Sequence, residues 1–265
     1  MKTPLGQNFL NDQRVLNKIV EGCDFTPQDT VVEIGPGKGS LTRLLASRLK
    51  TLYAIEYDRG LLPALHTEFD NSNVQIIHSD FLKWNFKGVP APIKVIGNIP
   101  YYISTSIIEH LLEHRVHITE AFLTVQKEFG ERLAAKPGGP PALRADRPGG
   151  KDYGSLSCFV QYYADVKVLF KIKNTCFTPP PKVDSCFVRL AFHPKPVYQP
   201  KDEQKMFTVI RTAFAQRRKT IVNALSPLAG KDALSAVLTR LGLSPQARPE
   251  TLSLQNYVDI SDALC

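Results

Sequence analysis

TVVEIGPGKGSL, residues 30–41, is the stretch that decides the fold of this chain. It runs from a β-branched segment, Thr30–Ile34, through a turn with three glycines into a helix-like segment. Glycines at a strand-to-helix turn let the backbone approach a ligand closely and leave the first N–H groups of the helix free to bind it. The stretch therefore predicts a strand, a ligand-binding turn and a helix.

Further β-type runs follow this stretch and alternate with helix-like segments. The four runs are Leu52–Glu56, Val74–Ser79, Ile93–Ile96 and Ala121–Val125. Alternation of this kind predicts an α/β fold, in which a parallel sheet carries helices on both faces. In such sheets ligands bind at the carboxyl ends of the strands. Most of the runs end in glycine, acidic or asparagine residues that are unusual in a strand. The functional site is therefore expected at the edge of the sheet where the strands end.

Two later β-type runs have no helix between them. They are Val166–Ile172 and Ser185–Phe192, joined by the proline-rich link 176–182. We expect them to form an antiparallel hairpin that closes the edge of the sheet. A separate segment, Lys136–Lys151, contains the triplet Pro-Gly-Gly twice and predicts a flexible inserted loop.

The composition turns helical after the hairpin. Apolar spacing and stop signals predict three helices, at Glu203–Leu225, Asp232–Leu241 and Leu254–Leu264. We therefore expect two domains. Residues 1–194 would form the sheet domain, and residues 195–265 would form a small all-α C-terminal domain that contacts RNA.

The composition is that of an ordinary globular protein, with 43% hydrophobic and 22% charged residues. No segment reaches the roughly 20 apolar residues of a membrane helix, and Met1–Leu10 has no apolar run of signal-peptide type. We therefore expect a cytoplasmic protein without a membrane partner. The net charge of +8 suits a phosphate-rich partner. The five cysteines are scattered, which argues against a disulfide framework and a zinc site.

Acidic residues at two strand ends predict a nucleoside site beside the glycine turn. Glu56 follows Gly35 by about 20 positions, a spacing that suits a hydrogen bond to a ribose diol. Asp80 is placed to accept from an adenine amino group. A dinucleotide site expects Gly-x-Gly-x-x-Gly, but here the third glycine comes one residue early, and Glu33 is awkward beside a diphosphate. Gly35 and Gly37 therefore favour an adenosyl cofactor over a dinucleotide, and a turn without any ligand is the alternative.

The segment Asn98–Ile99–Pro100–Tyr101 supplies groups for methyl transfer to an aromatic amine. The N6 lone pair of adenine is delocalised into the ring, so this nitrogen is a poor nucleophile. Asn98 and the backbone carbonyl of Ile99 can accept both N6 hydrogens and pull the nitrogen toward tetrahedral geometry. Pro100 stiffens the turn, and Tyr101 is placed to stack on the base. Phe177 is a second candidate for stacking, with a core aromatic as the alternative interpretation.

These motifs resemble a known family, the ribosomal RNA adenine N6,N6-dimethyltransferases. The similar stretches are Gly6–Leu10, Glu33–Gly37 and Asn98–Tyr101. One branch of the family, the KsgA type, acts on small-subunit RNA, and the erythromycin-resistance branch acts on large-subunit RNA. Further stretches favour the first branch, and they are Ala135–Gly138, Lys151–Leu156, Phe177–Ser185 and Ala213–Thr220.

The resemblance implies a Rossmann-like class I methyltransferase sheet and S-adenosylmethionine as cofactor. The reaction implied is dimethylation of N6 in two adjacent adenosines near the 3′ end of 16S RNA during ribosome biogenesis. The resemblance places cofactor contacts at Asn8, Leu10, Gly35, Glu56 and Asp80, and catalysis at Asn98–Tyr101; Asn98 is also expected to contact the cofactor. Tyr102 departs from the family, which commonly has a smaller polar residue there.

Basic residues near the start of the helical region are predicted to contact RNA phosphates. They are Arg211, Arg217, Arg218 and Lys219. A solvated basic face is the alternative interpretation. His110, His114 and His117 have the spacing of possible metal ligands, but a solvated helix face is the favoured interpretation, and we expect no metal.

Three other functions compete with the leading hypothesis. The large-subunit resistance enzyme shares the chemistry. A non-catalytic ribosome-assembly factor would share the fold, but the intact segment Asn98–Tyr101 and Glu56 argue against it. A nicotinamide dehydrogenase is disfavoured by the glycine spacing. The sequence therefore predicts a monomeric rRNA adenine dimethyltransferase whose partner is the small ribosomal subunit and its RNA.

Overall fold

The computed structural model describes residues 7–138 and 152–265. Most of the inserted loop expected from the sequence lies outside the described residues, as does Gly6. The chain divides into two compact units. The first comprises residues 1–130 and 165–194, and the second comprises residues 131–164 and 195–265. The second unit thus includes Glu131–Ala164, although the sequence predicted that these residues belong to the sheet domain. The division into functional domains stays a prediction.

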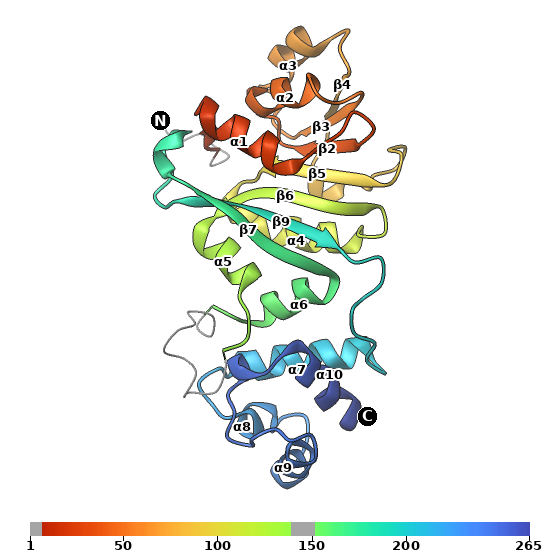
Figure 1. Cartoon of the computed structure of the whole chain (residues 1–265), viewed down its shortest axis with the longest axis vertical. Coiled ribbons are helices and arrows are strands. Elements are labelled where there is room, and N and C mark those ends of the chain that lie inside the picture. Colours follow the sequence, from red (N-terminus) through yellow and green to blue (C-terminus); the bar gives the residue numbers. More distant parts are fainter. Residues whose placement is uncertain (1–6, 139–151) are drawn as a thin grey trace. The chain divides into compact units, whose positions relative to one another are not determined.

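A seven-stranded sheet forms the centre of the first unit (Figure 1). Its strands lie in the order β4-β3-β2-β5-β6-β9-β7. Neighbours from β4 to β6 pair in parallel, and β9 pairs antiparallel with β6. The strands are β2 (Thr30–Ile34), β3 (Leu52–Glu56), β4 (Val74–His78), β5 (Ile93–Asn98), β6 (Ile118–Gln126), β7 (Ala164–Ile172) and β9 (Ser185–Phe192). The predicted α/β sheet, with the two late strands at one edge, is confirmed.

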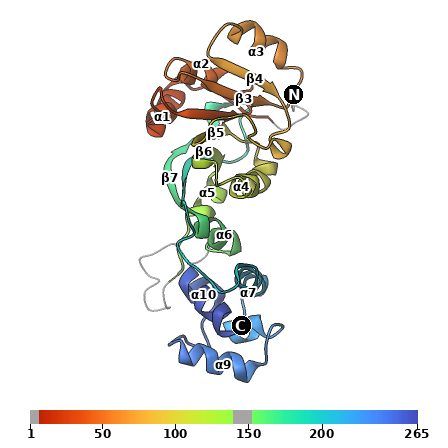
Figure 2. The ribbon, with the colours of Figure 1, turned by 90° about the vertical axis from the view of Figure 1, so that its right-hand side faces the viewer.

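Helices cover both faces of this sheet, and Figure 2 shows α1 and α4 on opposite sides of it. The helices are α1 (Gln13–Cys23), α2 (Ser40–Ala46), α3 (Leu62–Phe69), α4 (Ser104–Glu113) and α5 (Lys127–Ala134). Helix α1 begins where the Asp12 carboxylate accepts from the N–H groups of Arg14 and Val15. Its apolar face packs into the core because Leu16, Ile19, Val20 and Cys23 recur at helical spacing.

A second, two-stranded sheet was not predicted from the sequence. Strands β1 (Phe9–Leu10) and β8 (Phe177–Thr178) pair antiparallel, with Leu10 opposite Phe177. The Asn11 N–H donates to the Cys176 carbonyl oxygen at 3.1 Å and extends this pairing. The pair fixes the segment before α1 against the proline-rich link between β7 and β9.

The second unit is helical. It contains α6 (Ser155–Tyr163), α7 (Glu203–Ala215), α8 (Ile221–Leu225), α9 (Lys231–Arg240) and α10 (Leu254–Ala263). The single helix predicted over Glu203–Leu225 is wrong, because the chain leaves the helix at Gln216, with φ −126° and ψ 45°. The Ile221 N–H then donates to the Ala247 carbonyl oxygen at 2.7 Å instead of continuing the helix. This tertiary bond separates α7 from α8.

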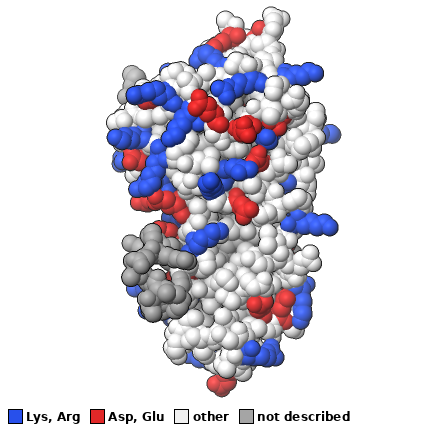
Figure 3. Space-filling view, in the orientation of Figure 1, with Lys and Arg blue, Asp and Glu red and all other residues white. Residues whose placement is uncertain are grey.

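Charged side chains of both signs cover the face of the molecule drawn in Figure 3. Over the sheet unit, Lys and Arg side chains are numerous but have Asp and Glu among them. The positive net charge therefore does not form one uninterrupted patch on that face.

Within the described residues, no helix has the length and apolar character needed to span a bilayer.

Candidate active site

Strands β2 and β5 lie side by side in the sheet. From β2 the chain continues to β3 and β4 on one side, and from β5 it continues to β6 on the other side, so the strand order reverses between β2 and β5. Ile34 at the end of β2 pairs with Gly97 near the end of β5. The glycine turn and the Asn98 segment therefore leave the sheet next to each other, at the place where α/β sheets bind ligands. A cavity of about 370 Å³ opens there.

Most of the residues predicted from the sequence line this cavity. Those brought together are Asn8, Leu10, Gly35, Gly37, Glu56, Asp80, Asn98, Ile99, Pro100 and Tyr101. Other lining residues were not singled out from the sequence, among them Phe9, Tyr57, Thr124 and Phe187. The cavity thus gathers groups from the ends of β2, β3, β4, β5 and β6 and from the segment before α1.

The turn after β2 requires glycine for two separate reasons. Gly35 and Gly37 have φ values of +64° and +61°, where side chains are strained. A Cβ at Gly37 would also lie 3.1 Å from Cε1 of the Phe9 ring. The turn therefore brings bare backbone to the cavity and packs closely under the N-terminal segment.

Glu56 connects this turn to the loop after β3. Its Oε2 accepts from the Gly37 N–H at 3.0 Å, and its Oε1 accepts from the Asp58 N–H at 2.7 Å. The side chain is buried, and each carboxylate oxygen retains capacity for a further donor. Glu56 can therefore both fix the two loops and accept from hydroxyl groups of a ligand.

Glu33 is a buried carboxyl group among the residues that line the same cavity. It is 2% exposed, and its Oε2 has no hydrogen-bond partner. Burial, together with the charge of Glu56, raises the pKa of Glu33 to about 8. Such a carboxyl group can pair with a cationic ligand, because a nearby positive charge would stabilise its ionised form.

Asp80 forms the beginning of a short 3₁₀-helix, η1 (Phe81–Lys83). Its Oδ1 accepts from the Leu82 N–H at 3.1 Å. The side chain is 34% exposed, so part of the carboxylate faces the cavity. This geometry leaves acceptor capacity for an amino group.

The orientation of the Asn98 amide is fixed by the N-terminal segment. Its Nδ2 donates to the backbone carbonyl oxygen of Asn8 at 2.9 Å. A carbonyl can only accept, so the nitrogen must point toward Asn8 and the Oδ1 atom must point away from it. The acceptor of the Asn98 side chain is thereby held in place before any substrate binds.

Tyr101 lies on a second 3₁₀-helix, η2 (Tyr101–Ile103), directly after Asn98–Pro100. Its hydroxyl group shares a hydrogen bond of 2.6 Å with Ser185 Oγ on β9. The Ile99 N–H donates to the Thr124 carbonyl oxygen at 3.3 Å. Strands β6 and β9 thus hold the segment predicted to be catalytic, and neither partner was foreseen from the sequence.

Comparison with known proteins identifies the family. The sequence matches the ribosomal RNA adenine dimethylase family over residues 1–265. The chain belongs to this family. It is 42% identical over 276 residues to ribosomal RNA small subunit methyltransferase A of Bacillus cytotoxicus, covering 99% of this chain and 91% of that protein. It is 43% identical to the enzyme of the same name from Moorella thermoacetica, covering 98% and 91%.

Solved structures of two methyl-transferring enzymes share the fold. A dimethyladenosine transferase from Plasmodium falciparum superposes with a TM-score of 0.78 at 24% identity, covering 95% of each chain. The 23S rRNA methyltransferase ErmE gives a TM-score of 0.75 at 25% identity, covering 97% of this chain and 99% of that one. The predicted class I methyltransferase fold is confirmed, and the protein is an S-adenosylmethionine-dependent rRNA adenine dimethyltransferase.

One predicted residue of the dimethylase site is not at the cavity. The Phe177 side chain is 3% exposed and packs in the hydrophobic core, and it does not line the cavity. The pairing of β8 with β1 accounts for this, because it places Phe177 beside the buried Leu10. The structure therefore favours the core-aromatic interpretation of Phe177 over stacking on a base.

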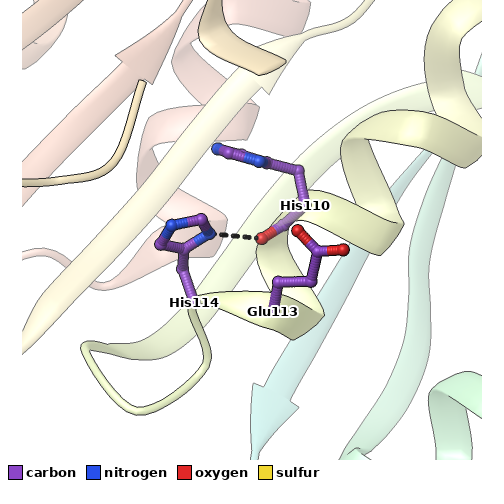
Figure 4. A group of neighbouring side chains, drawn as sticks. All are labelled: His110, Glu113 and His114. Atoms are coloured by element: carbon purple, nitrogen blue, oxygen red, sulfur yellow. Dashed lines mark hydrogen bonds between the residues drawn. The ribbon is translucent and has the colours of Figure 1, made fainter. Parts of the chain in front are cut away.

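The interpretation of His110 as part of a solvated helix face is also wrong. His110 is 8% exposed, its Nε2 donates to the Trp84 carbonyl oxygen at 2.8 Å, and its ring lies 5.3 Å from that of Phe81. Burial lowers its pKa. Figure 4 shows the His114 ring bonded to the His110 carbonyl oxygen, with Glu113 on the same turn. Ligand atoms of these three residues lie within 4.8 Å of one another, but both rings use a nitrogen to bond backbone.

The predicted RNA-binding residues lie in the second unit, mostly in the turn between α7 and α8. Arg211 is on α7, and Arg217, Arg218 and Lys219 follow its end. Arg211, Arg218 and Lys219 are exposed, whereas Arg217 is half-buried. The Arg217 Nη2 donates to the Tyr153 carbonyl oxygen at 2.8 Å. Arg217 therefore has a structural role within the helical unit.

Proposed function

We propose that this protein dimethylates N6 of two adjacent adenosines near the 3′ end of small-subunit ribosomal RNA. The observation that carries the chemistry is the fixed Asn98 amide. In the first transfer its Oδ1 and the Ile99 carbonyl oxygen accept hydrogen bonds from the two N6–H groups and direct the nitrogen lone pair out of the base plane; in the second transfer one of these oxygens accepts from the single N6–H group that remains. Tyr101, anchored at Ser185, stacks on the base and holds it there.

The residues around the cavity fit S-adenosylmethionine. This cofactor supplies a methyl group activated on a sulfonium, so the protein contributes mainly position and electrostatics. Glu33 offers its unpartnered oxygen to the positive charge of the cofactor. Glu56 accepts from the ribose hydroxyls and Asp80 from the adenine amino group. The backbone at Gly35 and Gly37 and the segment with Asn8 and Leu10 enclose the remainder.

Cofactor affinity is expected to rise with pH up to about 8. In the free protein Glu33 is protonated below its raised pKa of about 8. The cationic cofactor binds the ionised form, so binding releases a proton, and the affinity increases by up to about tenfold per pH unit below pH 8. Without cofactor, the same raised pKa makes folding stability fall as pH rises through this range.

Calorimetry of S-adenosylmethionine binding at pH 7, in buffers of different ionisation enthalpy, measures this proton release. The matched variant is Glu33→Gln, because glutamine resembles the protonated acid in shape and cannot ionise. It should bind the cofactor more weakly and without the pH dependence. If the wild type releases no proton, the proposed pairing of Glu33 with the cofactor is wrong.

We propose that exposed basic residues of the helical unit neutralise RNA phosphates. Arg218 and Lys219 are exposed at neighbouring positions in the turn after α7, and Arg211 is exposed on the helix itself. Replacing Arg218 and Lys219 by glutamine is expected to lower the slope of log affinity against log salt by about 1 for each lost phosphate contact. Filter binding to small subunits across a salt series measures the slope.

Arg217 provides a contrast within the same turn. Because it bonds to the Tyr153 carbonyl oxygen, Arg217→Gln should lower the stability of the helical unit. An unchanged salt slope in the Arg218→Gln/Lys219→Gln double variant would show that this turn is a solvated basic face.

The proposal also includes the setting of the reaction. We propose that the protein is a cytoplasmic monomer that acts on the small ribosomal subunit, without a metal or a membrane partner.

The test of the function is methyl transfer from labelled S-adenosylmethionine to unmethylated small subunits, with large subunits and naked RNA in parallel. Mass spectrometry identifies the modified nucleosides. Dimethyladenosine in the small subunit alone is the expected result. Label in large-subunit RNA would assign the protein to the resistance branch, and cofactor binding without any label would favour a non-catalytic assembly role.

A further inference from the structure

Two tyrosine rings at the cavity are unusually exposed. Among the described residues, the large hydrophobic side chains with high exposure are Tyr57, Tyr102, Val116, Val183, Val197 and Leu228. Only Tyr57 and Tyr102 are aromatic, at 60% and 69% exposed, and both line the cavity. Single exposed apolar residues are common on protein surfaces, but two aromatic rings that both border one binding cavity indicate surfaces for flat ligands.

The two tyrosines belong to different sides of the cavity. Tyr57 follows Glu56 at the end of β3, next to the groups proposed to bind the cofactor ribose. Tyr102 follows Tyr101 on η2, at the end of the strand that carries Asn98. Because β2 lies between β3 and β5, Tyr102 is on the substrate side of the sheet.

Tyr101 and Tyr102 are neighbours in sequence but differ in their surroundings. Tyr101 is partly buried, and its hydroxyl group is fixed by Ser185. Tyr102 is 69% exposed. In a 3₁₀-helix successive side chains are separated by about 120°, so the two rings project in different directions. One ring is therefore fixed inside the site, while the other extends from its rim toward solvent.

Extrusion of the target base creates a need for a second stacking surface. A base that enters the site leaves its stack, which costs a few kcal/mol, and its neighbour in the RNA loses a stacking partner. An exposed aromatic ring at the rim can replace that partner, because stacking on a ring suits any base.

We propose that Tyr102 is a positioning residue that stacks on the RNA base adjacent to the adenine held at Asn98. The inference rests on the proposed function and deepens it, since recognition then extends over two consecutive bases. For a substrate with two adjacent target adenosines, the base awaiting modification is held at Tyr102 while its neighbour reacts at Asn98.

The test compares Tyr102→Ala and Tyr102→Phe with the wild type in steady-state methyl transfer to small subunits. Tyr102→Ala should raise KM for the subunit about tenfold, a change of about 1.4 kcal/mol that is typical of base stacking. Its kcat and its affinity for S-adenosylhomocysteine should stay within about twofold of the wild type. Tyr102→Phe keeps the ring and should restore the wild-type KM.

Two matched variants separate this role from a general disturbance of the site. Tyr57→Ala removes the other exposed ring and should weaken cofactor binding while leaving KM for the subunit unchanged. Val116→Ala changes a side chain that is 78% exposed and does not line the cavity, and it should leave all constants unchanged.

A substrate change tests the contact itself. Subunits reconstituted with an abasic site beside the target adenosine should have a raised KM with the wild type. With Tyr102→Ala the abasic site should cause no further increase, because the stacked pair is already lost. The inference would be overturned if the abasic site raised KM equally with the wild type and with Tyr102→Ala. An unchanged KM for Tyr102→Ala, or a decrease confined to its kcat, would also overturn it. A wild type that binds cofactor but methylates no RNA would overturn the proposed function and this inference with it.

Discussion

Replacing Asn98 with alanine is expected to lower kcat for methyl transfer by about 100- to 1,000-fold, the cost of losing one preorganised hydrogen-bonding group at a reacting centre. The side chain supplies the acceptor that directs the N6 lone pair, and nothing else at that position replaces it. Binding of S-adenosylmethionine should be reduced far less, since the glycine turn, Glu33 and Glu56 are untouched. Single-turnover methylation of small subunits and calorimetric cofactor binding measure the two effects separately.

Asn98→Asp is the informative companion variant. Aspartate keeps an acceptor oxygen, but its carboxylate cannot donate to the Asn8 carbonyl oxygen as the Asn98 amide does. The loss of that bond removes the fixed orientation, so this variant should also be strongly impaired. Wild-type methylation by Asn98→Ala would contradict the catalytic assignment and revive the non-catalytic interpretation.

Replacing Gly130 with alanine is expected to destabilise the protein by about 1–3 kcal/mol, the usual cost of overpacking a core. Helix propensity alone predicts the opposite sign, because glycine inside a helix costs up to about 1 kcal/mol relative to alanine. However, Gly130 lies where α5 crosses β9, and a Cβ there would collide with Cys186 Sγ and lie 2.9 Å from Val188 Cγ1. Urea unfolding of the variant decides between the two effects.

Gly22→Ala is the matched control, because Gly22 is also in a helix, α1, but has room for a methyl group. The nearest atom to its added Cβ is Cε1 of Phe170, at an ordinary contact distance of 3.8 Å. This variant should be stabilised by about 0.4–1 kcal/mol. Adding Cys186→Ala to Gly130→Ala should recover part of the lost stability. A stabilised Gly130→Ala protein would show that α5 shifts away from the sheet at little cost.

Local pattern was sufficient to predict the elements whose signals are short-range. The bounds of β2 and β3 agree with their β-type runs, because each run is closed by glycine or by an acidic residue. The break between α7 and α8 was not predictable, since it depends on a bond from Ile221 to Ala247. The β1–β8 pair was missed for a similar reason: strands of two residues have no periodicity to detect.

The candidate site divides in the same way. Gly35, Glu56, Asp80 and Asn98 were predictable because each stands at the end of a strand, where parallel sheets bind ligands. Their supporting partners were not, because the Asn8 backbone and Ser185 approach the Asn98–Tyr101 segment only through the tertiary fold. The burial of Phe177 in the core was not predictable, because a proline-rich neighbourhood does not indicate whether a ring faces a cavity or the core.

The pairing of β1 with β8 also has a consequence for the timing of synthesis. The segment that orients Asn98 leaves the ribosome early, but its partner strand, Phe177–Thr178, is translated much later. At about 5–20 residues per second, the delay is on the order of 10 to 30 seconds. In the later part of that interval, once residues 98–101 have been translated, the nascent chain contains the segment proposed to be catalytic but lacks the strand that pairs with the segment orienting Asn98. A newly made molecule is therefore expected to acquire activity only after the sheet is nearly complete, and an unfinished enzyme is kept from acting on the ribosome that is producing it.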